Sequence, residues 1–115
     1  MLHPEQVDHI NIVNWFNFTY PQYKEDLHHF ANERRCSIQQ GRLLKKMGVK
    51  KGVSDFFLAV PRDGKGGLWI ELKVGTNKPT PEQKEFIERK INMGYTATCA
   101  WGAEAAKKVI KTYLR

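Results

Sequence analysis

The chain has 115 residues, a length that suits one domain over residues 1–115, and its hydrophobic fraction of 41% is ordinary for a protein that buries a core. No apolar run approaches the roughly 18 residues that cross a bilayer, and the N-terminus lacks the basic and apolar regions of a signal peptide. We therefore expect a cytoplasmic protein with no membrane partner. The net charge of +7 favours a polyanionic partner such as nucleic acid.

The N-terminal part of the chain predicts one helix and one strand-like run. Apolar residues recur at helical spacing over 4–17. We expect the inward face of this helix to carry Val7, Ile10, Val13 and Phe16. The run 27–31, LHHFA, is compatible with a short strand. On such a strand His28 and His29 resemble polar residues at a sheet edge more than a pair of metal ligands.

A second helix is predicted by its end signals. Ser37 and Gln40 fit a capping box that opens a helix over 38–47. Gly48 can supply the left-handed residue that ends it. The residues expected to face the core are Leu43, Leu44 and Met47.

Positive charge is concentrated in the same part of the chain. No acidic residue occurs from 34 to 54, whereas seven of the 19 basic residues fall there. They are Arg34, Arg35, Arg42, Lys45, Lys46, Lys50 and Lys51. Such a cluster favours a surface that contacts backbone phosphates, and the alternative is a merely solvated helix face.

Two strands joined by a turn are predicted next. The segments VSDFFLAV over 53–60 and LWIELKV over 68–74 flank PRDGKGG, which has the composition of a turn, so the pair should form a hairpin. Thr80 and Gln83 then form a second capping box, which opens a helix ending near Met93. Its inward residues should be Phe86, Ile87 and Ile91.

The C-terminal part completes a strand–helix–strand unit. The segment YTATCAW over 95–101 predicts a third strand, parallel to 68–74 and joined to it by a right-handed crossover. A last helix over 103–114 should turn inward Ala106, Val109, Ile110 and Tyr113. The predicted fold class is therefore α/β or α+β, with a small mixed sheet flanked by helices.

Three charged residues gather on one face of the predicted hairpin. Side chains alternate along a strand, so each core face stays apolar while Asp55, Glu71 and Lys73 share the other face. Two close carboxylates repel each other, and a hard divalent cation such as Mg²⁺ removes that repulsion. With a lysine to stabilise phosphate charge, the three residues suit phosphodiester hydrolysis. On spacing alone, a Glu-x-Lys triplet is more often a solvated strand face.

The combined motif resembles the VRR-NUC family, the virus-type replication-repair branch of the PD-(D/E)xK nucleases. It comprises GVSDFFLAVPRDGKGGLWIELK over 52–73, TPEQKEFI over 80–87 and GYTATCAWG over 94–102, with FANERR and KKMGVKKGVSD upstream. The resemblance implies a restriction-endonuclease-like core. It also implies a magnesium- or manganese-dependent endonuclease with no small-molecule cofactor.

The resemblance assigns roles to five residues around the hairpin. Asp55 and Glu71 match metal ligands, and the backbone carbonyl of Leu72 matches a further ligand. Lys73 matches the catalytic lysine. Gln83 matches a glutamine on the helix beside the site, although its capping box alone would also explain this residue.

An acidic residue on the first helix also belongs to the family's pattern. Glu5 is the expected residue, with Asp8 and His9 as neighbours that could take its place. A favourable acid in a first helical turn is the alternative explanation for Glu5. Asn32 matches a position near the basic segment and should contact phosphate or brace the site. Ser54 stands where the superfamily name implies proline.

The expected partners are DNA and a second copy of the chain. Stand-alone VRR-NUC proteins resemble small resolvases, which implies cleavage of branched DNA such as four-way (Holliday) junctions, in DNA repair or in a phage. A symmetric junction needs two matching cuts, and a two-fold homodimer offers two sites. The alternative is a non-catalytic DNA-binding module that keeps the nuclease fold.

Overall fold

One four-stranded mixed sheet forms the centre of the molecule, for which a computed structural model describes residues 1–30 and 37–115. Its strands are β1 (Leu27–His29), β2 (Phe56–Leu58), β3 (Leu68–Lys73) and β4 (Thr96–Trp101). They lie side by side in chain order, with β1 antiparallel to β2, β2 antiparallel to β3, and β3 parallel to β4. The predicted hairpin, the parallel third strand and the strand within 27–31 are thereby confirmed.

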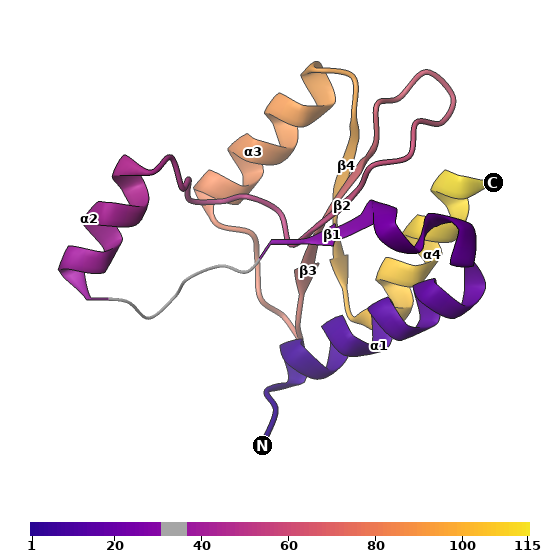
Figure 1. The fold of residues 1–115 in the computed structure, drawn as a ribbon, viewed down its shortest axis with the longest axis horizontal. Helices are drawn as coiled ribbons and strands as arrows, with labels where there is room; N and C mark the ends of the chain where they lie inside the picture. Colours follow the sequence, from indigo (N-terminus) through magenta and orange to yellow (C-terminus); the bar gives the residue numbers. More distant parts are fainter. Residues whose placement is uncertain (31–36) are drawn as a thin grey trace.

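Helices cover both faces of this sheet. They are α1 (Pro4–Thr19), α2 (Ile38–Lys46), α3 (Pro81–Asn92) and α4 (Ala103–Leu114), with a 3₁₀ turn, η1 (Pro21–Asp26), after α1. Figure 1 shows α1 and α4 together on one side of the sheet, α3 on the other, and α2 set apart from the body. The mixed α+β class is as expected. No helix in the described part of the chain is long and apolar enough to cross a bilayer.

The main core lies between the sheet and the α1–α4 pair. Alternate residues of β2 and β3 point into it and are fully buried, and the register sets Phe56 opposite Ile70 and Leu58 opposite Leu68. From α4 the core receives Ala103, Ala106, Ile110 and Tyr113. Val109 packs against it, so the predicted inward face of this helix is confirmed.

An aromatic cluster holds α3 against the opposite face of the sheet. Trp69 of β3 stacks on Phe57 of β2, with ring centroids 4.3 Å apart, and meets Phe86 of α3 edge-on at 4.9 Å. The ammonium of Lys90 lies 5.5 Å from the centre of the Trp69 ring, a cation–π contact. The inward positions predicted for α3 are right for Phe86 and Ile87, which are half-buried. The prediction is wrong for Ile91, which is 48% exposed.

The predicted inward face of α1 is right for Val13 and Phe16 and wrong for Val7 and Ile10. Val7 and Ile10 are each 49% exposed, whereas Ile12 and Phe16 are fully buried. Both buried positions continue, at helical spacing, a stripe that begins with Glu5 and His9. The apolar pattern predicted the wrong face in the N-terminal half of the helix, because the inward positions there are the polar residues Glu5 and His9.

The inward face predicted for α2 is also wrong. Leu43 and Met47 are 58% and 71% exposed, and no residue of this helix is buried. The helix forms as expected: Gln40 N–H donates to Ser37 Oγ at 3.0 Å, and Gly48 adopts φ +97° after its end. Because α2 stands away from the sheet, its apolar side has no core to cover.

The strand predicted over 53–60 is shorter in the structure, where β2 covers only Phe56–Leu58. Asp55 lies just before it, and its side-chain Oδ2 accepts a hydrogen bond from the backbone N–H of Leu72 at 2.7 Å. A carboxylate thus takes the place of a main-chain carbonyl in the contact with β3. This early end of β2 pairing places the Asp55 side chain beside Glu71.

Candidate active site

Two buried carboxylates meet where β2 begins and β3 ends. Asp55 and Glu71 are 2% and 1% exposed. The 2.7 Å hydrogen bond from Leu72 N–H holds the Asp55 carboxylate against β3, so it has little freedom to turn away. Sequence alternation placed these two residues on a common face, and the structure brings them together as expected.

The pKa of Glu71 is shifted by its burial and by the repulsion between the two carboxylates. Burial, followed by the neighbouring Asp55 carboxylate, raises the pKa of Glu71 from 4.5 to about 8, against an opposing effect from Lys73. Glu71 Oε2 lies 3.7 Å from Lys73 Nζ and accepts a hydrogen bond from Gln83 Nε2 at 3.3 Å. Glu71 Oε1 is buried and has no hydrogen-bond partner within the described chain.

Gln83 joins the start of α3 to the lysine of the site. Its Oε1 accepts hydrogen bonds from Lys73 Nζ at 2.6 Å and from Thr80 N–H at 2.9 Å, while its own N–H donates to Thr80 Oγ1 at 3.2 Å. With Nε2 donating to Glu71, every polar atom of this side chain is engaged. The capping explanation of Gln83 is therefore confirmed, and the same amide also contacts Lys73 and Glu71.

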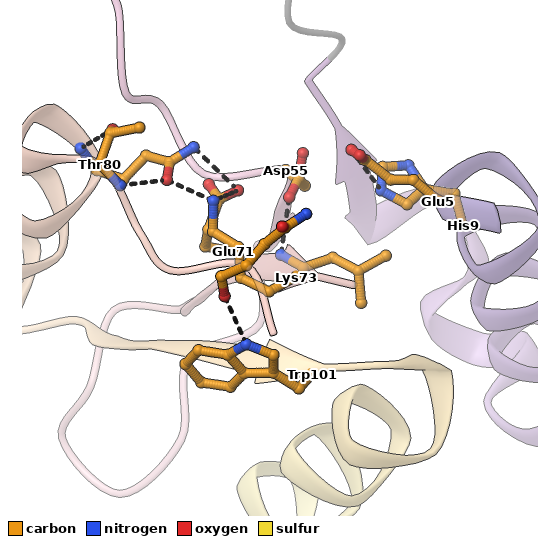
Figure 2. Close-up of polar contacts among 10 residues, drawn as sticks. Glu5, His9, Asp55, Glu71, Lys73, Thr80 and Trp101 are labelled. Carbon is orange, nitrogen blue, oxygen red and sulfur yellow. Dashed lines mark hydrogen bonds and ion pairs between the residues drawn. The ribbon is translucent and has the colours of Figure 1, made fainter. Parts of the chain in front are cut away.

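The first helix supplies the third side of the site. Glu5 and His9 lie one turn apart on α1 and point towards Asp55 (Figure 2). One ligand atom from each of Glu5, His9 and Asp55 lies within 4.8 Å of the other two. Burial lowers the pKa of His9, with the Asp55 carboxylate opposing. Of the residues weighed on this helix, Glu5 and His9 reach the site, and Asp8 does not belong to the group.

His29 also lies beside the site, although the sequence pattern did not place it there. Its Nδ1 lies 3.1 Å from the backbone carbonyl of Asp55, and its ring centroid is 4.5 Å from that of His9. The ring therefore braces both the aspartate main chain and the α1 imidazole. No local spacing pattern predicts these contacts, because β1 is distant in sequence from Asp55 and His9 and is brought beside them by the fold. His28 beside it is exposed.

The basic residues lie on the surface around α2. Those within the described part of the chain are all exposed, namely Arg42, Lys45, Lys46, Lys50 and Lys51. The three other predicted DNA contacts, Asn32, Arg34 and Arg35, fall outside the described residues. The chain after α2 returns to the site, since Gly52 packs closely against the backbone of Glu82 in the first turn of α3.

The donor set of the site fits a divalent cation. The carboxylates of Glu5 and Asp55 and the imidazole of His9 converge, Glu71 is buried beside Asp55, and the backbone N–H of Leu72 donates to the Asp55 carboxylate. A buried carboxylate oxygen without a hydrogen-bond donor, as at Glu71 Oε1, is costly unless something positive contacts it. Oxygen-rich sites of this kind suit Mg²⁺ and Mn²⁺.

The mixed sheet, with its acidic pair and lysine beside a helix-capping glutamine, defines the chain as a nuclease-fold domain. A solved structure described as "VRR_NUC domain protein" superposes with a TM-score of 0.85 at 29% sequence identity, and the match covers 99% of this chain and 90% of that one. Neither a protein-family model nor a curated protein matches the sequence. The structural likeness bears out the resemblance seen in the motifs, and the chain has a VRR-NUC-like nuclease fold.

Proposed function

We propose that the protein is a divalent-metal-dependent endonuclease that hydrolyses phosphodiester bonds in DNA. The observation that carries this proposal is the buried pair Asp55 and Glu71, held beside Lys73 within a VRR-NUC fold. Burying two carboxylates side by side costs stability, as the raised pKa of Glu71 indicates. A protein that only binds DNA gains nothing from that cost.

Four groups are proposed to hold the cation. They are the carboxylates of Glu5, Asp55 and Glu71 and the backbone carbonyl of Leu72. A bound Mg²⁺ or Mn²⁺ supplies positive charge to phosphate oxygens and lowers the pKa of water. Two observations support this assignment: Glu5 and Asp55 belong to one group of possible ligands, and Glu71 Oε1 has no hydrogen-bond donor within the described chain.

Lys73 is the proposed catalytic lysine. Its ammonium is almost fully buried, and the 2.6 Å hydrogen bond to Gln83 Oε1 fixes its direction. A charge held in place before the substrate arrives stabilises the developing negative charge of a phosphate without further reorganisation. In this scheme Gln83 positions the lysine, and Lys73 itself contacts the phosphate or the attacking water.

The proposed substrate is branched DNA such as a four-way junction, cut by a symmetric homodimer. The exposed basic residues around α2, together with Asn32, Arg34 and Arg35, would grip the flanking phosphates. Two identical sites related by a two-fold axis suit a substrate that needs two matching cuts. Sedimentation is the check on this assembly, with a species of twice the 13.4 kDa chain mass expected at micromolar concentration.

A cleavage assay tests the proposal directly. Labelled four-way junction, duplex and single-stranded DNA are incubated with the protein in Mg²⁺, Mn²⁺ or EDTA. We expect metal-dependent cleavage that is fastest on the junction, and a loss on the order of 100-fold or more for Lys73→Ala. Lys108→Ala, which removes an exposed lysine of α4, is the matched control and should cut like wild type.

Two outcomes would count against the proposal. DNA binding by wild type with no metal-dependent cleavage of any substrate would identify a non-catalytic DNA-binding module instead. If the Lys73→Ala variant cleaved DNA as fast as wild type, the proposed nuclease activity would stand but the proposed catalytic role of Lys73 would be wrong.

A further inference from the structure

We propose that His9 is itself a cation ligand, so that Glu5, His9 and Asp55 form a mixed nitrogen–oxygen site that prefers a first-row transition ion to Mg²⁺. This inference rests on the proposed function, in which carboxylates of the same site hold a divalent cation. It adds a residue and a metal preference that the carboxylates alone do not supply.

The first observation is the position of the His9 ring. Its Nε2 is buried and has no hydrogen-bond partner among the described residues. The nearest carboxylate oxygen, Glu5 Oε1, lies 4.0 Å away, which is too far for a hydrogen bond. The ring is held on its other sides by His29, at a centroid distance of 4.5 Å, and by Phe56 at 5.0 Å. The buried nitrogen thus lies at ion-pair distance from the Glu5 carboxylate but makes no hydrogen bond to it.

The second observation is the spacing of the ligand atoms. Those of Glu5, His9 and Asp55 all lie within 4.8 Å of one another. Around an octahedral ion with bonds of about 2.1 Å, neighbouring ligands are about 3 Å apart and opposite ligands about 4 Å. The 4.0 Å gap between Glu5 and His9 falls inside this range, so small side-chain movements would close the three atoms around one ion.

The third observation lies on the other side of Asp55. Glu71 is 1% exposed, and its Oε1 has no hydrogen-bond partner in the part of the chain that is described. Figure 2 shows Asp55 between Glu71 and the Glu5–His9 pair. An unpartnered carboxylate oxygen on one side of Asp55 and an unpartnered imidazole nitrogen on the other give two further atoms that could contact a cation.

The choice of metal follows from the imidazole. Mg²⁺ takes oxygen ligands almost exclusively, whereas imidazole nitrogen binds first-row transition ions well. A site with one nitrogen and several carboxylate oxygens should therefore discriminate against Mg²⁺. Without His9 the remaining ligands are all oxygens, and the preference should shrink.

The test uses Mn²⁺ as a paramagnetic probe of the DNA-free, untagged protein. The free-ion resonance in electron paramagnetic spectra gives the affinity, and electron spin-echo modulation reports whether a ¹⁴N nucleus is coordinated. We expect nitrogen modulation in wild type that changes on ¹⁵N-histidine labelling. His9→Asn should lose this signal and bind Mn²⁺ at least tenfold more weakly, with less than a threefold change for Mg²⁺ in competition.

The matched control is His28→Asn, which removes an exposed histidine of β1 and should leave both measurements unchanged. Absence of nitrogen modulation in wild type, or equal Mn²⁺ affinity in His9→Asn and wild type, would overturn the assignment. The labelling experiment needs no variant, so absence of a ¹⁵N-histidine effect in wild type overturns the assignment even if His9→Asn fails to fold.

The two proposals fail separately. Nitrogen coordination without cleavage of any DNA would support His9 as a ligand and contradict the proposed nuclease activity. Metal-dependent cleavage without nitrogen coordination would do the reverse.

Discussion

One amide side chain, that of Gln83, both caps α3 and contacts Lys73, the proposed catalytic lysine. It accepts from Thr80 N–H and Lys73 Nζ through the same oxygen. These two functions can be separated, because Thr80 takes part in the cap but does not contact the lysine or Glu71.

We expect Thr80→Ala to lower the free energy of unfolding by about 1 kcal/mol, since it breaks one arm of the capping box. Gln83→Ala should lower it further, because it also removes the hydrogen bonds to buried Lys73 and Glu71. Only Gln83→Ala should slow cleavage strongly, on the order of tenfold or more, because it releases Lys73. Denaturant titration and single-turnover cleavage measure the two effects. Equal cleavage rates for the two variants would show that the amide acts only as a cap.

Glu71 should make the metal-free protein sensitive to pH. Its pKa rises from 4.5 to about 8 on folding, so between these values the native state holds a proton that the unfolded state has released. The free energy of unfolding should therefore fall as pH rises through this window, by up to about 1.4 kcal/mol per pH unit. The contribution is complete below pH 4.5 and lost above about 8.

Thermal unfolding in EDTA from pH 5 to 9 measures this effect, with Glu71→Gln as the reference that cannot titrate at this position. We expect a steeper decline for wild type than for the variant. Added Mn²⁺ should stabilise wild type more at pH 8 than at pH 6, because it competes with the proton. Parallel pH profiles of the two proteins would contradict the raised pKa.

The residues of the site could be found from sequence to different degrees. Strand alternation predicted that Asp55, Glu71 and Lys73 share a face, since a period of two fixes orientation locally. The first helix was harder, because its inward stripe starts with the polar Glu5 and His9 and the exposed apolar residues suggested another face. Long-range contacts such as that of His29 with Asp55 leave no local pattern.

At the scale of elements, one close approach joins the basic segment to the site. Gly52 has φ +82°, and a Cβ at this position would lie 2.6 Å from the carbonyl carbon and oxygen of Glu82. Gly48 has φ +97° but nothing within 4 Å of its added Cβ. Comparing the two glycines therefore separates two contributions to the free energy of unfolding. Substitution at Gly48 tests only the left-handed backbone, whereas substitution at Gly52 also creates a steric clash with Glu82.

Gly48→Ala should destabilise by about 1–2 kcal/mol through backbone strain alone. Gly52→Ala should destabilise further, because the segment 50–52 must move away from the first turn of α3. Since that turn carries Gln83, only Gly52→Ala should also reduce cleavage. Chemical denaturation and cleavage rates of both variants provide the check, and an activity loss of the same size in each would contradict a specific contact at Gly52.

The elements themselves were predictable where a local signal defined them. The capping boxes at Ser37 and Thr80 correctly marked the starts of α2 and α3, because both partners of each box lie within four residues. What α2 faces was not predictable, since an amphipathic pattern gives the apolar side of a helix but not its neighbour. The shortened β2 reflects a side chain, that of Asp55, which pairs in place of the main chain.

At the scale of the whole molecule, the net charge of +7 is unevenly distributed. Five of the seven basic residues of the 34–54 segment lie in the described part, and all five are exposed. If these residues contact phosphates, the affinity for DNA should depend on which basic residues are neutralised, and not only on how many.

We expect the double variant Lys45→Gln, Lys46→Gln to weaken junction binding and to lower the slope of log affinity against log salt by about 0.9 for each phosphate that is no longer neutralised. Lys65→Gln combined with Lys108→Gln removes the same charge from exposed positions elsewhere and is the control. Fluorescence anisotropy at several salt concentrations measures both. Identical slopes for the two double variants would mean that α2 acts through net charge alone.

The central strand β3 has a consequence for how this protein can change over time. Leu68, Ile70 and Leu72 enter the core, while Glu71 and Lys73 point to the opposite side. A point substitution can therefore remove a charged residue of the site and spare the fold. Insertion or deletion of one codon within the strand would exchange the two faces, placing charge in the core and leucine in the site. Descendants of this domain that lose Glu71 or Lys73 should accordingly arise by substitution and keep the length of β3 unchanged.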